Sequence, residues 1–330
     1  MMVGPMRRRT LKSVYFRALG LLRVDRLLQA IRRSRGEVVV LNLHRVSPDP
    51  SPFWPPLAPD AFQALVAYLD RTCDVLTFGE LAKGRGSDRL KVVLSFDDGC
   101  RDFVEYVAPI LAKYRLRANL NVIVSSVETG QPPWTIALMD ALADADATRV
   151  RGLEVPGFPH RLESDDDDAM VKYGTLLANY LKAMPPNERV DVTSDIEALL
   201  SETSEEALTP MMSIEDVVTV GDLHELGCHS YSHESMAQMD SEEFAGELDR
   251  CTTFFADLDC PMNIFAFPNG SYRSDQVETL LARGVEHILV VDERPSTTIR
   301  GCHPRITMYG DSAAELRLRG MGWRAIPWTR

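Results

Sequence analysis

Short runs of apolar residues recur along the chain and predict buried strands. The clearest are residues 38–43 (VVVLNL), 91–96 (KVVLSF) and 118–124 (ANLNVIV). Each run is bounded by polar or turn-forming residues and is shorter than a typical helix, which favours a strand. Three further runs of this kind end at residues 226–229, 264–267 and 288–291.

Segments with apolar residues at helical spacing separate these runs. They span residues 61–70, 103–114, 242–255 and 275–283, and a proline-rich loop at 48–59 precedes the first. An alternation of strands and helices is typical of an α/β fold with a mostly parallel sheet. In such folds the functional residues gather where the strands end.

The pattern changes between residues 128 and 208. This stretch holds seventeen acidic residues against six lysines and arginines, and its apolar residues follow helical spacing at 136–145 and 169–183. We therefore expect an acidic, mainly helical insertion. Four consecutive aspartates at 165–168 indicate a solvated loop or helix start, because calcium loops space their ligands at alternate residues.

Residues 1–36 form a basic arm. The first 35 residues hold ten lysines and arginines and one acidic residue, so they carry +9 and leave −21 of the total −12 for the rest. Apolar residues recur at helical spacing over 11–33, and we expect Gly20 to divide this stretch into two helices. Residues 7–35 either lie in an anionic membrane interface or pack across one end of the fold, with their arginines facing the acidic body.

Length and composition narrow the class of protein. A chain of 330 residues accommodates one large α/β domain or two smaller ones, and a net charge of −12 argues against a general nucleic-acid-binding protein. The arm lacks the uninterrupted apolar core of a secretory signal, and the six scattered cysteines suggest reduced thiols. We expect a cytoplasmic protein, peripheral to the inner membrane if the arm binds lipid.

The first candidate for chemistry is Ser95-Phe96-Asp97-Asp98-Gly99, at the end of a predicted strand. Two adjacent carboxylates on a sharp glycine turn can face one centre from different angles. One can then bind a metal ion while the other remains free as a general base. The alternative is a turn with an aspartate at the start of a helix.

The second candidate is the HSYSH segment, in which His229 and His233 follow another predicted strand. Two imidazoles four residues apart on a helical turn share a face and can bind one ion. Two histidines and a carboxylate leave a coordination position open for water, as in catalytic zinc sites. Taken alone, such a pair favours structural or exposed histidines, and it is the position after a predicted strand that favours a metal site.

The third candidate is the turn at residues 265–272 (FAFPNGSY), which again follows a predicted strand. A rigid turn can direct a backbone N–H at a developing oxyanion, although an ordinary turn has the same sequence signature.

The ordered set SFDDG, G-x-H-S-x-x-H and F-A-F-P-x-G resembles the polysaccharide deacetylase family, the NodB-homology group of carbohydrate esterases. The resemblance spans roughly residues 38–308. It implies an α/β fold, a distorted incomplete (β/α) barrel, as a catalytic domain at 37–310 that is interrupted by the 128–208 insertion and followed by a tail at 311–330. It also implies that Asp97 is the general base, that Asp98, His229 and His233 bind the metal, and that the Asn269 N–H helps to hold the oxyanion.

The sequence departs from the family pattern in two places. Ala266 occupies the position where many members carry an arginine beside the catalytic aspartate, and the late Leu-x-His motif is missing. This combination resembles the subgroup with the biofilm poly-N-acetylglucosamine deacetylases, in which an early strand-end histidine is the acid; here that is His44. Arg305 either supplies the missing cation beside Asp97 or lies at the surface. His303 and His224 are weaker candidates for the acid.

The resemblance implies removal of an N-acyl group, acetyl first, from an amino sugar of a bacterial glycan or a lipid-linked saccharide. It implies one divalent ion, zinc first, with cobalt, nickel or manganese as alternatives. An O-acetyl esterase and a sugar deformylase on the same scaffold remain alternatives, as does a catalytically inactive glycan-binding protein. Four retained Asp and His residues disfavour the last, because an inactive site has no physical need for all of them.

Overall fold

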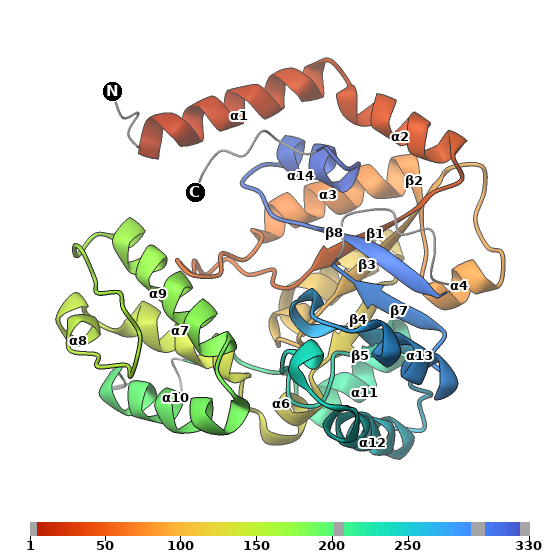
Figure 1. Ribbon diagram of the computed structural model, residues 1–330. Helices are drawn as coiled ribbons and strands as arrows, with labels where there is room; N and C mark the ends of the chain where they lie inside the picture. Colours follow the sequence, from red (N-terminus) through yellow and green to blue (C-terminus); the bar gives the residue numbers. More distant parts are fainter. Residues whose placement is uncertain (1–4, 201–207, 292–300, 324–330) are drawn as a thin grey trace.

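The computed structural model describes residues 5–200, 208–291 and 301–323 (Figure 1). Seven parallel strands form its barrel, in the order β1-β8-β7-β6-β5-β4-β3, and pairing of β1 with β3 closes the ring. The strands are β1 Val38–Leu43, β3 Leu90–Phe96, β4 Asn119–Val122, β5 Glu225–Cys228, β6 Ile264–Ala266, β7 His287–Val290 and β8 Cys302–Thr307. The predicted distorted, incomplete barrel is confirmed, with seven strands in place of eight.

An eighth strand distorts the wall of the barrel. Strand β2 (Cys73–Val75) pairs with the first half of β3, from Leu90 to Val92, whereas β4 pairs with Ser95 and Phe96 at its end. Because β1 occupies the opposite edge of β3 along its length, β2 and β4 share one edge. The sheet therefore splits along this edge: β2 continues it beside the first half of β3, and β4 continues it beside the end of β3.

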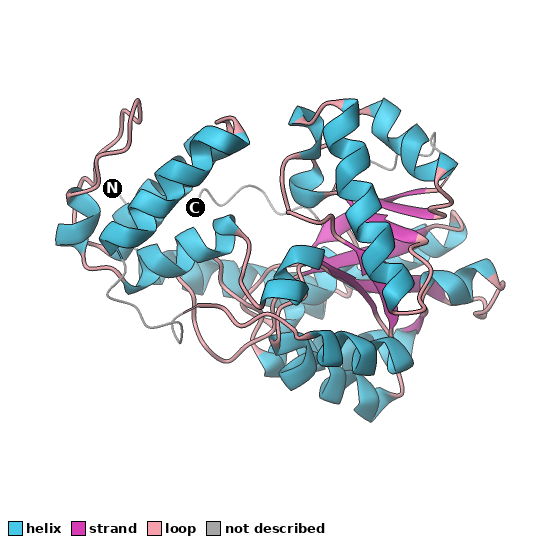
Figure 2. Ribbon diagram, turned by 90° about the horizontal axis from the view of Figure 1, so that it is seen from below, coloured by secondary structure: helices cyan, strands magenta, loops and turns pink. Residues whose placement is uncertain are grey.

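Helices surround the strands (Figure 2). Helix α12 (Ser241–Asp257) illustrates why they form: Asp240 caps its first turn, and Phe244, Leu248, Cys251 and Phe255 bury one apolar face. The other helical segments of the barrel are α3 Pro59–Thr72, α4 Phe78–Ala82, the π-helix Phe103–Val107, α5 Ala108–Tyr114, α6 Val124–Thr129, α11 Ile214–Leu223, α13 Ser274–Ala282 and α14 Ala313–Gly320, with 3-10 turns at Met236–Gln238 and Pro268–Gly270.

The acidic insertion is helical, as predicted, and stands beside the barrel (Figures 1 and 2). It contains α7 Trp134–Asp144, α8 Ala147–Arg151, α9 Asp167–Lys182 and α10 Pro186–Leu200. Its apolar residues form a hydrophobic cluster of their own, centred on Leu138, Leu177 and Leu181. Within the run of four aspartates, Asp166 caps α9, which agrees with the predicted helix start.

The basic arm forms α1 (Pro5–Leu21) and α2 (Val24–Ser34), which lie across α14 (Figure 1). The predicted break at Gly20 is wrong by three residues: the chain turns at Arg23, whose φ of 54° is left-handed, while Gly20 stays helical against Ala314 and Arg317. Phe16 is fully buried, so one face of the arm packs on the fold. In the described part of the chain, no helix has the length and apolar character to cross a membrane.

Candidate active site

The predicted site residues converge at the carboxyl edge of the barrel. Asp97 and Asp98 follow β3, His229 and His233 follow β5, and Asn269 follows β6. The Asp97 N–H donates to Leu43 O at the end of β1 (3.0 Å), and the His229 N–H donates to Val122 O at the end of β4 (2.8 Å). Parallel register therefore brings residues more than a hundred positions apart to one level of the barrel.

The two aspartates diverge because the backbone turns sharply. Asp98 and Gly99 both have positive φ, 77° and 79°. A side chain at Gly99 would meet Val122 Cγ1 at 3.2 Å as well as the unfavourable φ, so glycine fits here. A left-handed aspartate is a strained conformation of the kind that persists at functional sites.

Asp98, His229 and His233 form a ligand set that could hold one metal ion. Asp98 Oδ1 lies 3.4 Å from His229 Nε2 and 3.5 Å from His233 Nε2, and one ligand atom from each residue lies within 4.8 Å of the others. Asp98 Oδ1 is buried and has no hydrogen-bond partner. A buried carboxylate oxygen that faces two imidazole nitrogens fits a divalent cation, which would satisfy all three.

Hydrogen bonding prepares His229 for this role. Its Nδ1 lies 2.8 Å from the carbonyl oxygen of Ala266, so Nδ1 carries the proton and Nε2 is left with its lone pair toward Asp98. Burial, reinforced by Asp97, raises the pKa of Asp98 well above its usual range, and burial together with His229 lowers the pKa of His233 well below its own. A cation between these groups would favour the ionised carboxylate and the neutral imidazoles.

The expected helical turn between the two histidines is wrong. Ser230 and His233 have φ values of 66° and 59°, which a right-handed helix excludes. Instead, buried Glu247 of α12 accepts hydrogen bonds from the Tyr231 and Ser232 N–H groups, each at 3.0 Å. This carboxylate holds a loop that brings the imidazoles together, with ring centres 5.1 Å apart.

Asp97 lies beside the ligand set and is held as an anion. Its Oδ1 accepts hydrogen bonds from Arg305 Nη1 (2.7 Å) and Asn121 Nδ2 (2.8 Å), while Oδ2 is 3.9 Å from His229 Nε2. Burial acts to raise the pKa of Asp97, but Arg305 and His229 outweigh it and hold that pKa below the usual range. An ionised carboxylate with one oxygen directed at the metal ligands suits a general base.

Arg305 of β8 is fully buried. It therefore lies beside Asp97 and not at the surface, the other position that the sequence allowed. It supplies the positive charge beside Asp97 that an alanine at position 266 cannot provide. Asn121, which the sequence analysis did not select, holds the same carboxylate oxygen. A sequence signal for Asn121 was present: Asn119 and Asn121 are polar residues at alternate positions of an otherwise apolar strand. Both side chains point into the barrel and contact Ser95.

His44 follows β1 on the Asp97 side of the site and packs edge-on against Trp54, with ring centres 5.5 Å apart. Burial, with smaller effects of Arg305 and His229, lowers its pKa to about 4 against the opposing effect of Asp97. The two weaker candidates lie elsewhere. His303 Nε2 is 3.0 Å from His287 Nδ1 beside Phe78, and His224 Nδ1 accepts the Ala118 N–H.

Asn269 adopts a left-handed conformation (φ 55°, ψ 10°) in the turn after β6. Its side-chain Oδ1 accepts a hydrogen bond from Lys182 Nζ at 3.0 Å. Lys182 is the last residue of α9, so the insertion reaches the rim of the site, and its charge contributes to the lowered pKa of His233. Sequence reasoning missed Lys182, because nothing in its local sequence distinguishes it from a surface lysine.

Comparisons with known proteins agree with this geometry. The sequence model of the family described as "Polysaccharide deacetylase" matches residues 201–288, which include His229, His233 and Asn269. No curated protein matches the chain at a significant level.

Solved structures share the fold at low sequence identity. The Streptococcus pyogenes deacetylase PplD in complex with acetate superposes with a TM-score of 0.56 at 14% identity, covering 86% of this chain and 97% of that one. IcaB from Ammonifex degensii gives 0.54 at 16% identity with the same coverage, and a de-N-acetylase from Aggregatibacter actinomycetemcomitans gives 0.50 at 14%, covering 81% and 93%. The resemblance to the polysaccharide deacetylases is therefore confirmed, by sequence over residues 201–288 and by fold over most of the chain.

Proposed function

We propose that this protein removes an N-acyl group, acetyl first, from an amino sugar of a bacterial glycan or a lipid-linked saccharide. The observation that carries the proposal is the pairing of an ionised aspartate, Asp97, with an adjacent His-His-Asp ligand set. That combination suits water attack on a carbonyl carbon that resists weak nucleophiles. The titles of two similar structures, a deacetylase with acetate and a de-N-acetylase, support the same reaction class.

Asp98, His229 and His233 would hold one divalent ion, zinc first, because two imidazoles and a carboxylate in a buried site suit that ion. When bound, such an ion polarises the acyl carbonyl and lowers the pKa of a nearby water. Both histidines are held in place: the carbonyl oxygen of Ala266 orients the His229 ring, and Ser230 Oγ accepts the backbone N–H of His233 at 2.9 Å.

The chain's own residues complete the reaction. Asp97 takes a proton from the attacking water as its oxygen bonds to the acyl carbon. The Asn269 backbone N–H stabilises the negative charge that develops on the carbonyl oxygen. His44 delivers a proton to the amine nitrogen as the C–N bond breaks, releasing a carboxylic acid and a free amino sugar. Because burial lowers the pKa of His44 to about 4, the imidazole is neutral at pH 7, and the proton that it delivers is the one that Asp97 takes from the attacking water.

A mass-spectrometric screen of N-acetylated, N-formylated and O-acetylated sugars tests the proposal. We expect loss of an acetyl group from nitrogen, and a roughly 10²-fold or greater fall in kcat for Asp97→Asn with bound metal retained. His160→Ala, at an exposed histidine of the insertion, is the matched control and should keep full activity. Preferred release of a formyl group or of O-linked acetate would move the function to one of the two enzyme alternatives. Glycan binding without turnover by the metal-loaded protein would overturn the proposal.

A further inference from the structure

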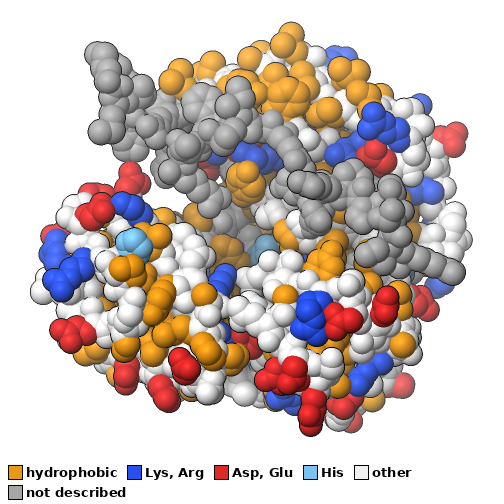
Figure 3. Space-filling model, in the orientation of Figure 1, with side chains coloured by type: hydrophobic (Ala, Val, Ile, Leu, Met, Phe, Trp, Pro, Cys, Tyr) orange, Lys and Arg blue, Asp and Glu red, His pale blue; other side chains and the backbone are white. Residues whose placement is uncertain are grey.

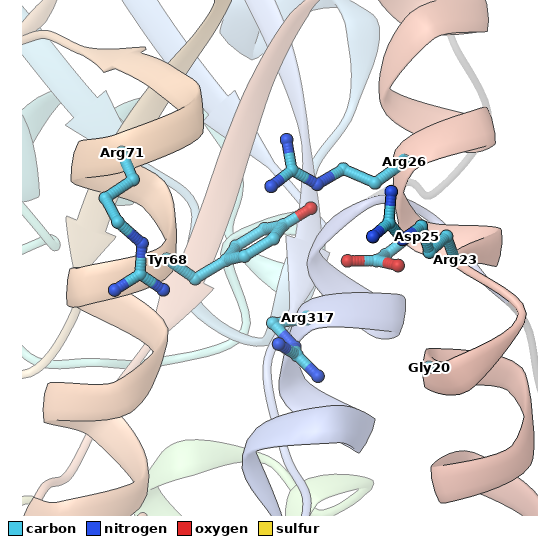
Figure 4. Close-up of a pocket in the computed structure, with 7 residues that line it drawn as sticks. All are labelled: Gly20, Arg23, Asp25, Arg26, Tyr68, Arg71 and Arg317. Carbon is cyan, nitrogen blue, oxygen red and sulfur yellow. The ribbon is translucent and has the colours of Figure 1, made fainter.

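A second candidate site lies away from the metal ligands, between the arm and the barrel. It is a cavity of about 250 Å³ formed by α1, α2, α3 and α14 (Figure 4). The residues that line it are Gly20, Arg23, Asp25, Arg26, Tyr68, Arg71 and Arg317. The lining therefore contains four arginines and one carboxylate, which gives the cavity a net positive charge.

This charge is not neutralised within the protein. Among the described residues, none of the four arginines forms an ion pair, whereas the neighbouring Arg319 pairs with Glu315. Asp25 is buried, with 5% of its surface exposed, and is the single acidic group of the cavity. Arg23, Arg26 and Arg71 are exposed and Arg317 is half-buried, so the excess positive charge lies at the surface of the protein, where it attracts anions.

Buried polar atoms inside the cavity also lack partners. Arg317 Nε is buried and makes no hydrogen bond, and the buried Tyr68 hydroxyl makes none of normal geometry, although the Asp25 carboxylate lies close enough to help raise the pKa of Tyr68. Tyr68 is 3% exposed, and its hydroxyl points toward Arg26 and Asp25 (Figure 4). Arg26 and Arg317 stack near its ring, at 5.6 and 5.4 Å from the ring centre, which holds both guanidiniums at the cavity. A phosphate oxygen there would satisfy donors that are otherwise unpaired.

Large apolar side chains flank the cavity and face solvent. Leu21, Leu22 and Leu27 are 84%, 75% and 61% exposed, although they occupy helices that pack on the fold with their other face. Hydrophobic side chains gather at the top of the molecule, over the arm, next to lysines and arginines (Figure 3). Exposed leucines that alternate with arginines are typical of a helix that lies in an anionic lipid interface.

We propose that the arginine-lined cavity binds the phosphate of an anionic membrane lipid, with the leucines of the arm inserted beside it. Guanidinium forks match phosphate geometry, and the exposed leucines favour a lipid over a soluble phosphate compound. The rest of the chain carries −21, so the basic arm is the part that an acidic membrane attracts. The proposal is independent of the proposed function, because no residue of the cavity belongs to the active site.

Flotation of the full-length protein with vesicles provides the test, using neutral phosphatidylcholine alone and mixed with phosphatidic acid. The pocket variant is Arg26→Gln/Arg71→Gln. The control, Arg17→Gln/Arg33→Gln, removes the same charge from exposed positions of the arm outside the cavity. We expect flotation only with acidic vesicles, an increase of about tenfold in the lipid needed by the pocket variant, and a much smaller change in the control.

Two further measurements separate the alternatives. The Leu21→Ser/Leu22→Ser variant should no longer float, whereas inorganic phosphate should raise the thermal midpoint of this variant and of the wild type alike. Phosphate stabilisation that the pocket variant loses, without flotation of the wild type, would replace the lipid with a soluble phosphate ligand and overturn the membrane assignment. Equal losses in the pocket and control variants would show general charge attraction and overturn the cavity. Unchanged circular dichroism and an unchanged thermal midpoint in the absence of phosphate verify that each variant folds.

Discussion

Replacing Arg305 with methionine would leave the Asp97 carboxylate buried with no cation beside it. The Arg305 side chain is 0% exposed and Asp97 is 2% exposed, so solvent cannot screen the loss of the 2.7 Å contact. Removal of one partner from a buried ion pair costs roughly 3–5 kcal/mol of unfolding free energy. Asn121 still donates to the same oxygen, so we expect a value near the lower limit, about 3 kcal/mol.

A double-mutant cycle isolates the charge from the change of shape. Asp97→Asn alone leaves the arginine buried and unpaired, whereas Asp97→Asn combined with Arg305→Met removes both charges. The double variant should therefore be less destabilised than the sum of the single variants, by about 2 kcal/mol. Urea unfolding of all four proteins, with and without a chelator, provides the four free energies and separates the contribution of bound metal.

Kinetics add a readout that a purely structural role would not change. Arg305 lowers the pKa of Asp97, so Arg305→Met should raise it. Because the base acts as the ionised carboxylate, activity is lost as the pH falls through this pKa, and the acid limb of kcat/KM should move to higher pH. Arg305→Lys should recover part of the stability and part of the shift. Additive single-variant free energies together with an unmoved acid limb would refute the coupling.

Three other predictions follow from the site. His229→Ala and His233→Ala should each lose bound metal in elemental analysis of purified protein, while His160→Ala retains it; equal metal content in all three would contradict the ligand assignment. His44→Ala should slow amide cleavage far more than cleavage of an activated nitrophenyl ester, whose leaving group needs no proton, so equal losses would remove His44 from the acid role. Gly227→Ala should lower the urea midpoint, at a cost of roughly 1–3 kcal/mol, because its Cβ would lie 2.2 Å from Asn121 Oδ1 and 3.0 Å from Ile264 Cγ2. An unchanged midpoint would show that β4 and β6 adjust freely around it.

Most barrel strands, and the carboxyl edge at which the site lies, could be predicted because they depend on the local pattern of apolar residues. The run at Val38–Leu43 matches β1, and parallel pairing then fixes which residues meet at the strand ends. Short elements without a strong pattern were not predicted. Strand β8 contains Cys302, His303 and Arg305, and only its position in the barrel makes it a strand. Helix α14 lies in the segment expected to be a tail.

Long-range contacts account for the other differences. A histidine pair four residues apart favours a helical turn by local rules, but Glu247 from a distant helix fixes a different loop. The sequence left Arg305 with two possible positions, and its hydrogen bonds to Ser95 of β3 and to Asp97, which follows that strand, decide between them. The contact of Lys182 with Asn269 joins residues 87 positions apart, which no local pattern encodes.

The separate hydrophobic cluster of the insertion has a consequence for how the enzyme loses activity on heating. Helices α7 to α10 bury their apolar residues mainly against one another, so they form a unit that can open while the barrel stays folded. That unit holds Lys182 on Asn269, and it holds Arg189, which is stacked on Trp134, against Glu234 next to His233. Catalysis should therefore fail at a lower temperature than the barrel melts, and amide hydrogens of α9 should exchange before those of β3.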